Sequence, residues 1–167
     1  MSQRRAEAII DTDALASNIA LLKGVAGTEL LAVVKADAYG HGLINVAKAA
    51  EKAGADWLGT ALLEEGIALR KGGITKPIIS WLTPIGDDFK TAIDLDIDLS
   101  ISSIELLNEI ILAGKSINRV PRVHIEIDTG MLLNGKYAPR PDFPDTPVIG
   151  DMIGVKISSP IARQAFD

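Results

Sequence analysis

A lysine directly after a short apolar run is the residue in this sequence best placed for covalent chemistry. Residues 30–34 are all apolar, which is typical of a strand covered on both faces, and Lys35 follows at once. At the carboxyl end of a barrel strand such an amine faces the active-site mouth, where partial desolvation makes it a good nucleophile. Tyr39 adds a phenolic donor, and Gly40 and Gly42 let the backbone approach a ligand closely. On residue chemistry alone, a lysine that only extends its amine into solvent fits equally well.

Other kinds of reactive centre find little support in the sequence. His41 and His124 are far apart and lack a partner at metal-ligand spacing, so we expect no metal site and favour a packing role for His124. The absence of cysteine excludes a disulfide framework, a thiolate zinc site and a cysteine nucleophile. Trp81 lies at the end of a strand pattern, and it either walls a ligand pocket or packs in the core or at its rim.

Length and composition indicate a globular domain. The chain has 167 residues, 47% of them hydrophobic, and a net charge of −5 without clustered lysine or arginine. Nucleic acid is therefore not an expected partner. No segment approaches the roughly 20 apolar residues that span a bilayer, and the N-terminus lacks the apolar core of a signal peptide. We expect a cytoplasmic protein with no membrane partner.

Strand and helix patterns alternate along most of the chain. Five strand patterns separated by helical patterns predict βα units and a parallel sheet, and hence an α/β protein. Asp11 or Asp13 is expected to cap the first helix and Gly24 to end it. The predicted strands are 30–34, 57–59, 77–82, 97–101 and 122–127, and the predicted helices are 14–23, 43–53, 61–71, 87–94 and 103–114.

The pattern changes after residue 135. Four of the eight prolines fall within residues 136–147, which excludes a helix or a central strand there. A further strand is predicted at 152–157. Because a closed eight-stranded barrel needs about 200–250 residues, we expect an incomplete TIM-type (β/α) barrel of five or six units. Residues 1–135 would form its N-terminal part and 136–167 a Pro-rich loop with a possible last strand, and open edges would favour self-association or a homodimer.

The segment around Lys35 also resembles a known family. The string Ala32-Val33-Val34-Lys35-Ala36-Asp37-Ala38-Tyr39-Gly40-His41-Gly42 is similar to the cofactor-lysine motif of bacterial alanine racemases. Two other segments match in the expected order: Asp11-Thr12-Asp13-Ala14-Leu15 with Asn18 near the start, and Asp128-Thr129-Gly130-Met131 later. The resemblance covers residues 6–135.

The resemblance implies a fold, a cofactor and a reaction. It implies a barrel that binds pyridoxal 5'-phosphate (PLP), with Lys35 as the Schiff-base residue and as an acid or base at Cα of alanine. Tyr39 would bind the cofactor phosphate. A looser match of residues 153–160 to the end of the family's barrel places Ile153 at the phosphate as well. The implied activity is the interconversion of L- and D-alanine, a precursor step for peptidoglycan.

The sequence departs from the family's pattern after the later landmark. Leu133 occupies the position of an arginine that contacts the cofactor in the family, and an apolar side chain cannot replace that ion pair. Glu126 matches a residue that braces this arginine, although a solvent-facing strand residue is an equal reading. The family's second catalytic tyrosine has no counterpart, and Tyr137 lies in the Pro-rich segment. We therefore expect impaired racemisation; the alternative is a non-catalytic PLP-binding module or assembly fragment.

Overall fold

A computed structural model describes residues 7–127 and 153–156. In this part of the chain, strands and helices alternate as βα units, and one sheet carries the strands in the order β1-β2-β3-β4-β5-β6. The strands are β1 (Leu31–Val33), β2 (Trp57–Thr60), β3 (Ile78–Ser80), β4 (Ile97–Ile101), β5 (Val123–Ile127) and β6 (Ile153–Lys156). The helices are α1 (Thr12–Ala26), α2 (Lys35–Gly40), α3 (Leu43–Lys52), α4 (Leu63–Lys71), α5 (Phe89–Asp94) and α6 (Ile104–Ser116).

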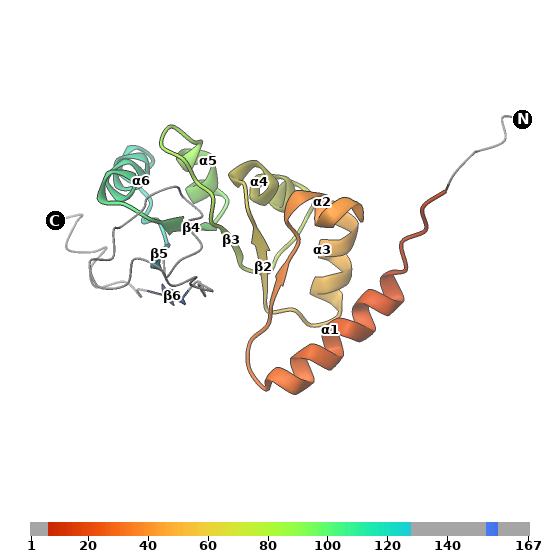
Figure 1. Cartoon of the computed structure of the whole chain (residues 1–167). Coiled ribbons are helices and arrows are strands. Elements are labelled where there is room, and N and C mark those ends of the chain that lie inside the picture. Colours follow the sequence, from red (N-terminus) through yellow and green to blue (C-terminus); the bar gives the residue numbers. More distant parts are fainter. Residues whose placement is uncertain (1–6, 128–152, 157–167) are drawn as a thin grey trace, which may run out of the picture.

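The first five strands are parallel, as the alternating pattern predicts. Each pairs with the next one along the chain, for example Val33 with Gly59 and Ser100 with His124. Figure 1 shows α3 to α6 following one another along one side of the sheet, in the order of the strands. This is the wall of a (β/α) barrel, made of consecutive units with the helices outside.

The sixth strand lies at its predicted place but has the opposite direction. β6 pairs with β5 antiparallel, with Ile127 opposite Ile153. It is therefore not a sixth βα unit, and the parallel part of the sheet has five strands. A parallel return needs a crossover that is usually a helix, whereas an antiparallel return does not, and the Pro-rich sequence before β6 has no helical pattern.

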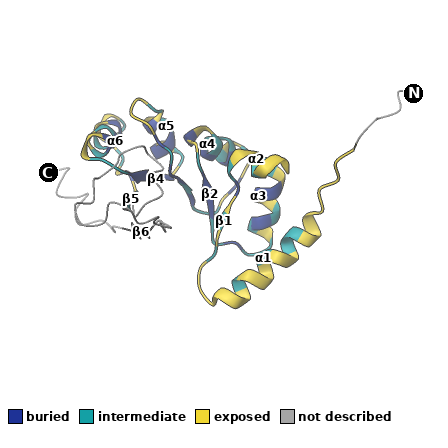
Figure 2. Ribbon diagram, viewed as in Figure 1, coloured by how far each residue is buried: buried dark blue, intermediate teal, exposed yellow. Residues whose placement is uncertain are grey.

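The core lies between the sheet and the helices. Leu58, Ile78 and Leu99 on the central strands are fully buried, as are Phe89 of α5 and Ile110 of α6. Figure 2 shows the buried residues concentrated in the strands and on the inner side of the helices. In β4, Ile97, Leu99 and Ile101 belong to this core, and polar residues alternate with them along the strand.

None of the residues of helix α1 is buried, which among the described helices is otherwise true only of the short α2. The Asp11 carboxylate accepts hydrogen bonds from the backbone N–H groups of Asp13 and Ala14, so Asp11 is the N-cap. The expected stop at Gly24 is wrong: the helix continues to Ala26 and ends at Gly27, whose φ of 62° forms a left-handed cap.

No helix in the described part of the chain is long and apolar enough to cross a membrane.

Candidate active site

Lys35 lies at the carboxyl end of β1, as the sequence predicts. The preceding Val34 is 1% exposed, and its N–H donates to the carbonyl of Gly59, which continues the pairing of β1 with β2. Lys35 itself is half-buried. Its ammonium Nζ lies 5.9 Å from the centre of the Trp81 ring, within the range of a cation–π contact. Lys35 and Trp81 therefore meet across β2, from strands that are not neighbours.

Gly59 makes this contact possible. A Cβ atom at Gly59 would lie 2.6 Å from Trp81 Cζ3 and 3.0 Å from Leu31 Cδ2, closer than van der Waals contact. The indole of Trp81 thus lies directly over the glycine of the intervening strand. Trp81 is 9% exposed, so it both packs in the structure and walls the region beside the lysine. The packing role expected of Trp81 is therefore confirmed, and its role as the wall of a ligand pocket stays a prediction.

The segment after Lys35 forms a left-handed turn that the sequence does not predict. Four consecutive residues, Ala36, Asp37, Ala38 and Tyr39, have φ between 50° and 55°. Left-handed helical backbone costs about 1–2 kcal/mol per residue for side chains other than glycine. Such a turn persists only where its surroundings hold it, and backbone of this kind concentrates at functional sites.

Hydrogen bonds hold the turn at both ends. The Leu43 N–H donates to the Asp37 carboxylate at 2.7 Å, and the Gly42 N–H donates to the Asp37 carbonyl at 3.0 Å, which joins the turn to the start of α3. At the other end, the Ala36 N–H donates to Glu65 Oε1 at 2.6 Å. Gly42 has a φ of 92°, which a residue with a side chain rarely adopts.

The other predicted residues of the motif lie on the same turn. Tyr39 is 73% exposed, so its phenol is accessible. The His41 ring is hydrogen-bonded through Nδ1 to the carbonyl of Ala38 at 2.8 Å, which ties the ring to the turn. Within residues 7–127 and 153–156, no carboxylate forms an ion pair with the Lys35 ammonium. The amine thus lies near an aromatic ring, and no described carboxylate neutralises it.

A polar network lies on the same face of the sheet as the Trp81 ring, at strands β4 and β5. Asp98 is 0% exposed and accepts hydrogen bonds from Arg122 Nε at 2.7 Å and from His124 Nε2 at 2.9 Å. The His124 ring meets the Trp57 ring edge-on, with 5.9 Å between their centres. Because β2 and β5 are three strand spacings apart, about 14 Å in a flat sheet, this contact indicates a sheet curved like a barrel wall.

Glu126 lies beside this network. It is half-buried and accepts a hydrogen bond from the Ser100 hydroxyl at 3.2 Å, and its role as a brace stays a prediction. The position that it would brace, Leu133, lies outside the described residues. Ile153 is placed only by its backbone pairing in β6. No group of three or more potential metal ligands occurs in the described part of the chain.

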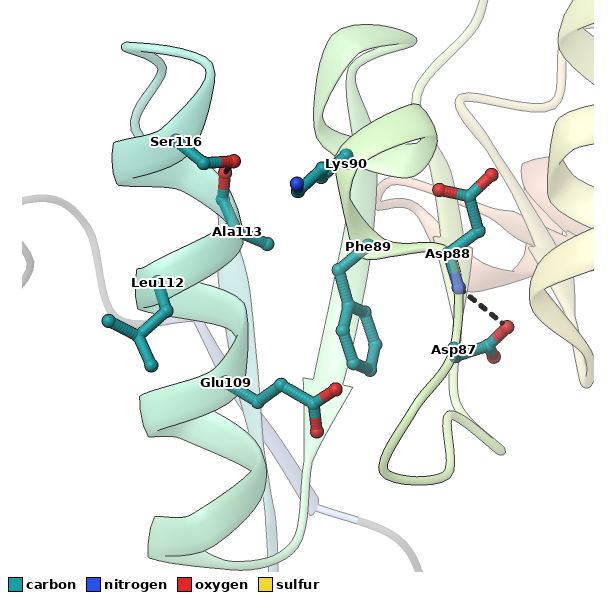
Figure 3. Close-up of a pocket in the computed structure, with 8 residues that line it drawn as sticks. All are labelled: Asp87, Asp88, Phe89, Lys90, Glu109, Leu112, Ala113 and Ser116. Carbon is teal, nitrogen blue, oxygen red and sulfur yellow. Dashed lines mark hydrogen bonds between the residues drawn. The ribbon is translucent and has the colours of Figure 1, made fainter.

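A pocket lies in the helical layer, away from Lys35. This pocket of about 330 Å³ is lined by Asp87, Asp88 and Phe89 on one side and by α6 residues including Glu109 on the other (Figure 3). Burial raises the pKa of Asp87, and the nearby carboxylates of Glu64 and Glu109 raise it further, against a hydrogen bond from the Asp88 N–H. None of the residues predicted for function lines the pocket.

The class of protein follows from this geometry: a parallel (β/α) barrel wall with a lysine amine at the carboxyl end of its first strand. The model of the family described as alanine racemase, N-terminal domain, matches residues 10–145. Since this match includes most of the sequence, the chain belongs to the alanine racemase N-terminal domain family.

Individual relatives agree with the family match. The alanine racemase of Thermobifida fusca is 48% identical over 131 residues, which are 78% of this chain and 35% of that protein. The enzyme of Mycolicibacterium smegmatis is 43% identical over 141 residues, or 84% of this chain and 36% of its own length. The chain thus spans about a third of the length of the curated relatives that it matches.

Solved structures confirm the fold. The alanine racemase of Streptomyces coelicolor superposes with a TM-score of 0.71 at 38% identity, covering 81% of this chain and 36% of that one. The alanine racemase from the D-cycloserine-producing Streptomyces lavendulae gives a TM-score of 0.67 at 43% identity, covering 68% of this chain and 30% of that one. The predicted α/β fold, a part of the racemase barrel, is therefore correct.

Proposed function

We propose that this chain binds pyridoxal 5'-phosphate through Lys35 and acts on the Cα–H bond of alanine. The observation that carries the proposal is the position of the Lys35 amine, half-buried at the carboxyl end of β1 and beside the Trp81 ring. This is where (β/α) barrels place their reactive groups. Membership of the alanine racemase family supplies the substrate class.

The described residues fit a flat aromatic cofactor with an aldehyde and a phosphate. The Lys35 amine has no ion pair in the described part of the chain, so it is available for a covalent bond to an aldehyde. The Trp81 indole, which lies directly over Gly59, offers an apolar wall. Tyr39 presents an exposed phenol that would donate to the phosphate, and we keep Ile153 as a second neighbour of the phosphate.

The proposed mechanism assigns the proton transfer to Lys35. When bound, pyridoxal phosphate supplies an electron sink for the charge left at Cα. The Lys35 amine takes the Cα proton on the face that it occupies and returns it there. The left-handed turn from Ala36 to Tyr39 sets the path of the backbone between Lys35 and Tyr39, and so the relative positions of their two side chains.

Racemisation requires a second acid or base on the opposite face of Cα. Tyr39 and Tyr137 are the two tyrosines of the sequence, and Tyr137 lies outside the described residues, in the Pro-rich segment. Leu133, at the family's arginine position, adds no charge. We therefore propose that this 167-residue chain by itself exchanges the Cα proton on one face and racemises alanine poorly.

A second candidate function is a non-catalytic cofactor-binding or assembly module. The edge of the described sheet favours it, because among residues 7–127 and 153–156 β1 is a terminal strand, and its Val33 is 52% and its Leu31 39% exposed. An apolar parallel edge of this kind promotes pairing with another chain, so we propose that the chain self-associates, as in a homodimer. The cysteine-free sequence suits a reducing compartment, and we propose the cytoplasm as its location.

Proton exchange in D₂O distinguishes these functions. The chain with pyridoxal phosphate is incubated with each alanine enantiomer, and loss of the Cα–H signal and change of chirality are followed by NMR, with Lys35→Ala as the control. Exchange of the Cα proton without rapid inversion supports the proposal, provided that Lys35→Ala shows no exchange. Rapid inversion would show that the chain is a competent racemase. Cofactor binding without exchange would establish the non-catalytic module.

A further inference from the structure

Glu65, in the first turn of α4, ties the Lys35 segment to the connection between β2 and α4. Its Oε2 accepts hydrogen bonds from the backbone N–H groups of Ala61 and Leu62, at 3.1 Å and 3.0 Å. Its Oε1 accepts the Ala36 N–H at 2.6 Å. One carboxylate therefore joins the β2–α4 connection to the peptide unit that directly follows the lysine.

We propose that Glu65 is a positioning residue for the Lys35 amine, an inference that rests on the proposed function. The Ala36 N–H belongs to the peptide bond formed by the Lys35 carbonyl, so anchoring it restricts the backbone rotation that directs the Lys35 side chain. Ala36 is also the first residue of the left-handed turn. Without the carboxylate, this turn loses a bond that offsets its unfavourable backbone conformation.

The chemistry of the contact requires a carboxylate. Three N–H donors converge on the two oxygens of Glu65, and an ionised carboxylate has acceptor sites for all of them. A glutamine has one acceptor oxygen. Its NH₂ group would point its own N–H bonds at a backbone N–H donor, which repels it. Hydrogen bonds to a charged acceptor are also about twice as strong as those between neutral groups.

Glu64 provides a matched control. It is the neighbouring residue in the same first turn of α4, it is exposed, and it carries the same charge at the positive end of the helix dipole. Glu64→Gln therefore changes the net charge and the helix-end electrostatics as Glu65→Gln does. It leaves the acceptor for the Ala36 N–H in place.

The experiment compares the full chain with Glu65→Gln and Glu64→Gln. Pyridoxal phosphate binding is titrated by absorbance well below the unfolding temperature of each variant, and borohydride-reduced peptides give the share of label on Lys35. Leaving an N–H donor without its acceptor changes an equilibrium constant by about a factor of ten. Glu65→Gln should therefore weaken pyridoxal phosphate binding about tenfold and spread the label to other lysines. Glu64→Gln should behave as the unsubstituted chain.

Amide hydrogen exchange without cofactor supplies an independent readout. The Ala36 amide should exchange about tenfold faster in Glu65→Gln and at the original rate in Glu64→Gln. Unchanged Lys35 labelling and cofactor affinity in folded Glu65→Gln would overturn the positioning role, and a lower unfolding temperature alone would indicate only a structural one. If the unsubstituted chain fails to bind pyridoxal phosphate at Lys35, the proposed function fails. In that case, an unchanged exchange rate of the Ala36 amide in Glu65→Gln would also reject Glu65 as the anchor of this amide. A faster rate would support the anchor.

Discussion

The Lys35 ammonium lies 5.9 Å from the centre of the Trp81 ring, although the two residues follow strands separated by β2. The contact exists because the residue between them is Gly59, whose missing side chain is replaced by the indole. The aromatic wall of the candidate site therefore depends on a glycine in the middle of a strand, a position where glycine otherwise weakens a sheet.

Substitution of Gly59 by alanine tests this packing. The new Cβ would lie 2.6 Å from Trp81 Cζ3, so the indole must move or the strand must shift. We expect the free energy of unfolding in urea to fall by about 1–3 kcal/mol. Gly24→Ala is the control, because no atom lies within 4 Å of a Cβ there and the helix should gain about 0.5–1 kcal/mol.

A double variant identifies the indole as the cause. Gly59→Ala combined with Trp81→Leu should lose less stability than the two single losses added together, since the smaller side chain removes the overlap. Additive losses would mean that Gly59 and Trp81 are not coupled.

The sequence predicts the fold well because its patterns are local. The strand before Lys35 and the helices that follow each strand are readable from hydrophobic periodicity, and β4 (Ile97–Ile101) has the predicted bounds. The expectation that the strand before Lys35 is covered on both faces is wrong, because Leu31 and Val33 of β1 are exposed. Ser103 is the helix cap that its residue type suggests, since its hydroxyl accepts the Leu106 N–H at 3.2 Å.

The supporting contacts of the site could not be predicted in this way. Alanine favours right-handed helix, so the residue types give no sign of the left-handed turn that begins at Ala36. The Glu65 contact that anchors it joins residues 29 positions apart. Glutamates in the first turn of a helix are explained well enough by the helix dipole, so nothing in the sequence singles out Glu65.

Glycine at position 36 tests the left-handed turn. Ala36 has φ and ψ of 53°, and glycine adopts this conformation without the steric cost of a side chain. After allowance for the more flexible unfolded chain, Ala36→Gly should stabilise the fold by about 0.5–1 kcal/mol in urea unfolding. Ala20→Gly, on the exposed side of α1, should instead destabilise it by about 1 kcal/mol. Equal losses in both variants would show that Ala36 is right-handed.

Acid should weaken the attachment of α1. The Leu30 N–H and the Lys23 ammonium both donate to the Asp56 carboxylate, and they lower its pKa below the ordinary value of 3.8. A carboxylate with a lowered folded-state pKa contributes stability above its unfolded pKa and loses this contribution as the pH falls through the folded value. We therefore expect stability to decline below about pH 4 as Asp56 takes up a proton.

Asp56→Asn isolates this contribution from those of other carboxylates. Unfolding free energies of the variant and the unsubstituted chain are compared in urea at about pH 6, 4 and 3. The difference between them should be largest at the highest pH and shrink toward the lowest, because the protonated aspartate resembles asparagine. A difference that stays constant with pH would contradict the assignment.

The most direct test of the central claim, that Lys35 is the cofactor lysine, is borohydride trapping with pyridoxal phosphate followed by peptide mass mapping. The claim predicts one dominant reduced adduct, on the peptide that contains Lys35, and its loss in Lys35→Ala with no compensating label elsewhere. Lys23→Ala is the matched control, since Lys23 is engaged by Asp56 and the Gly54 carbonyl. No adduct, or label spread evenly over the lysines of both the chain and Lys35→Ala, would contradict the account.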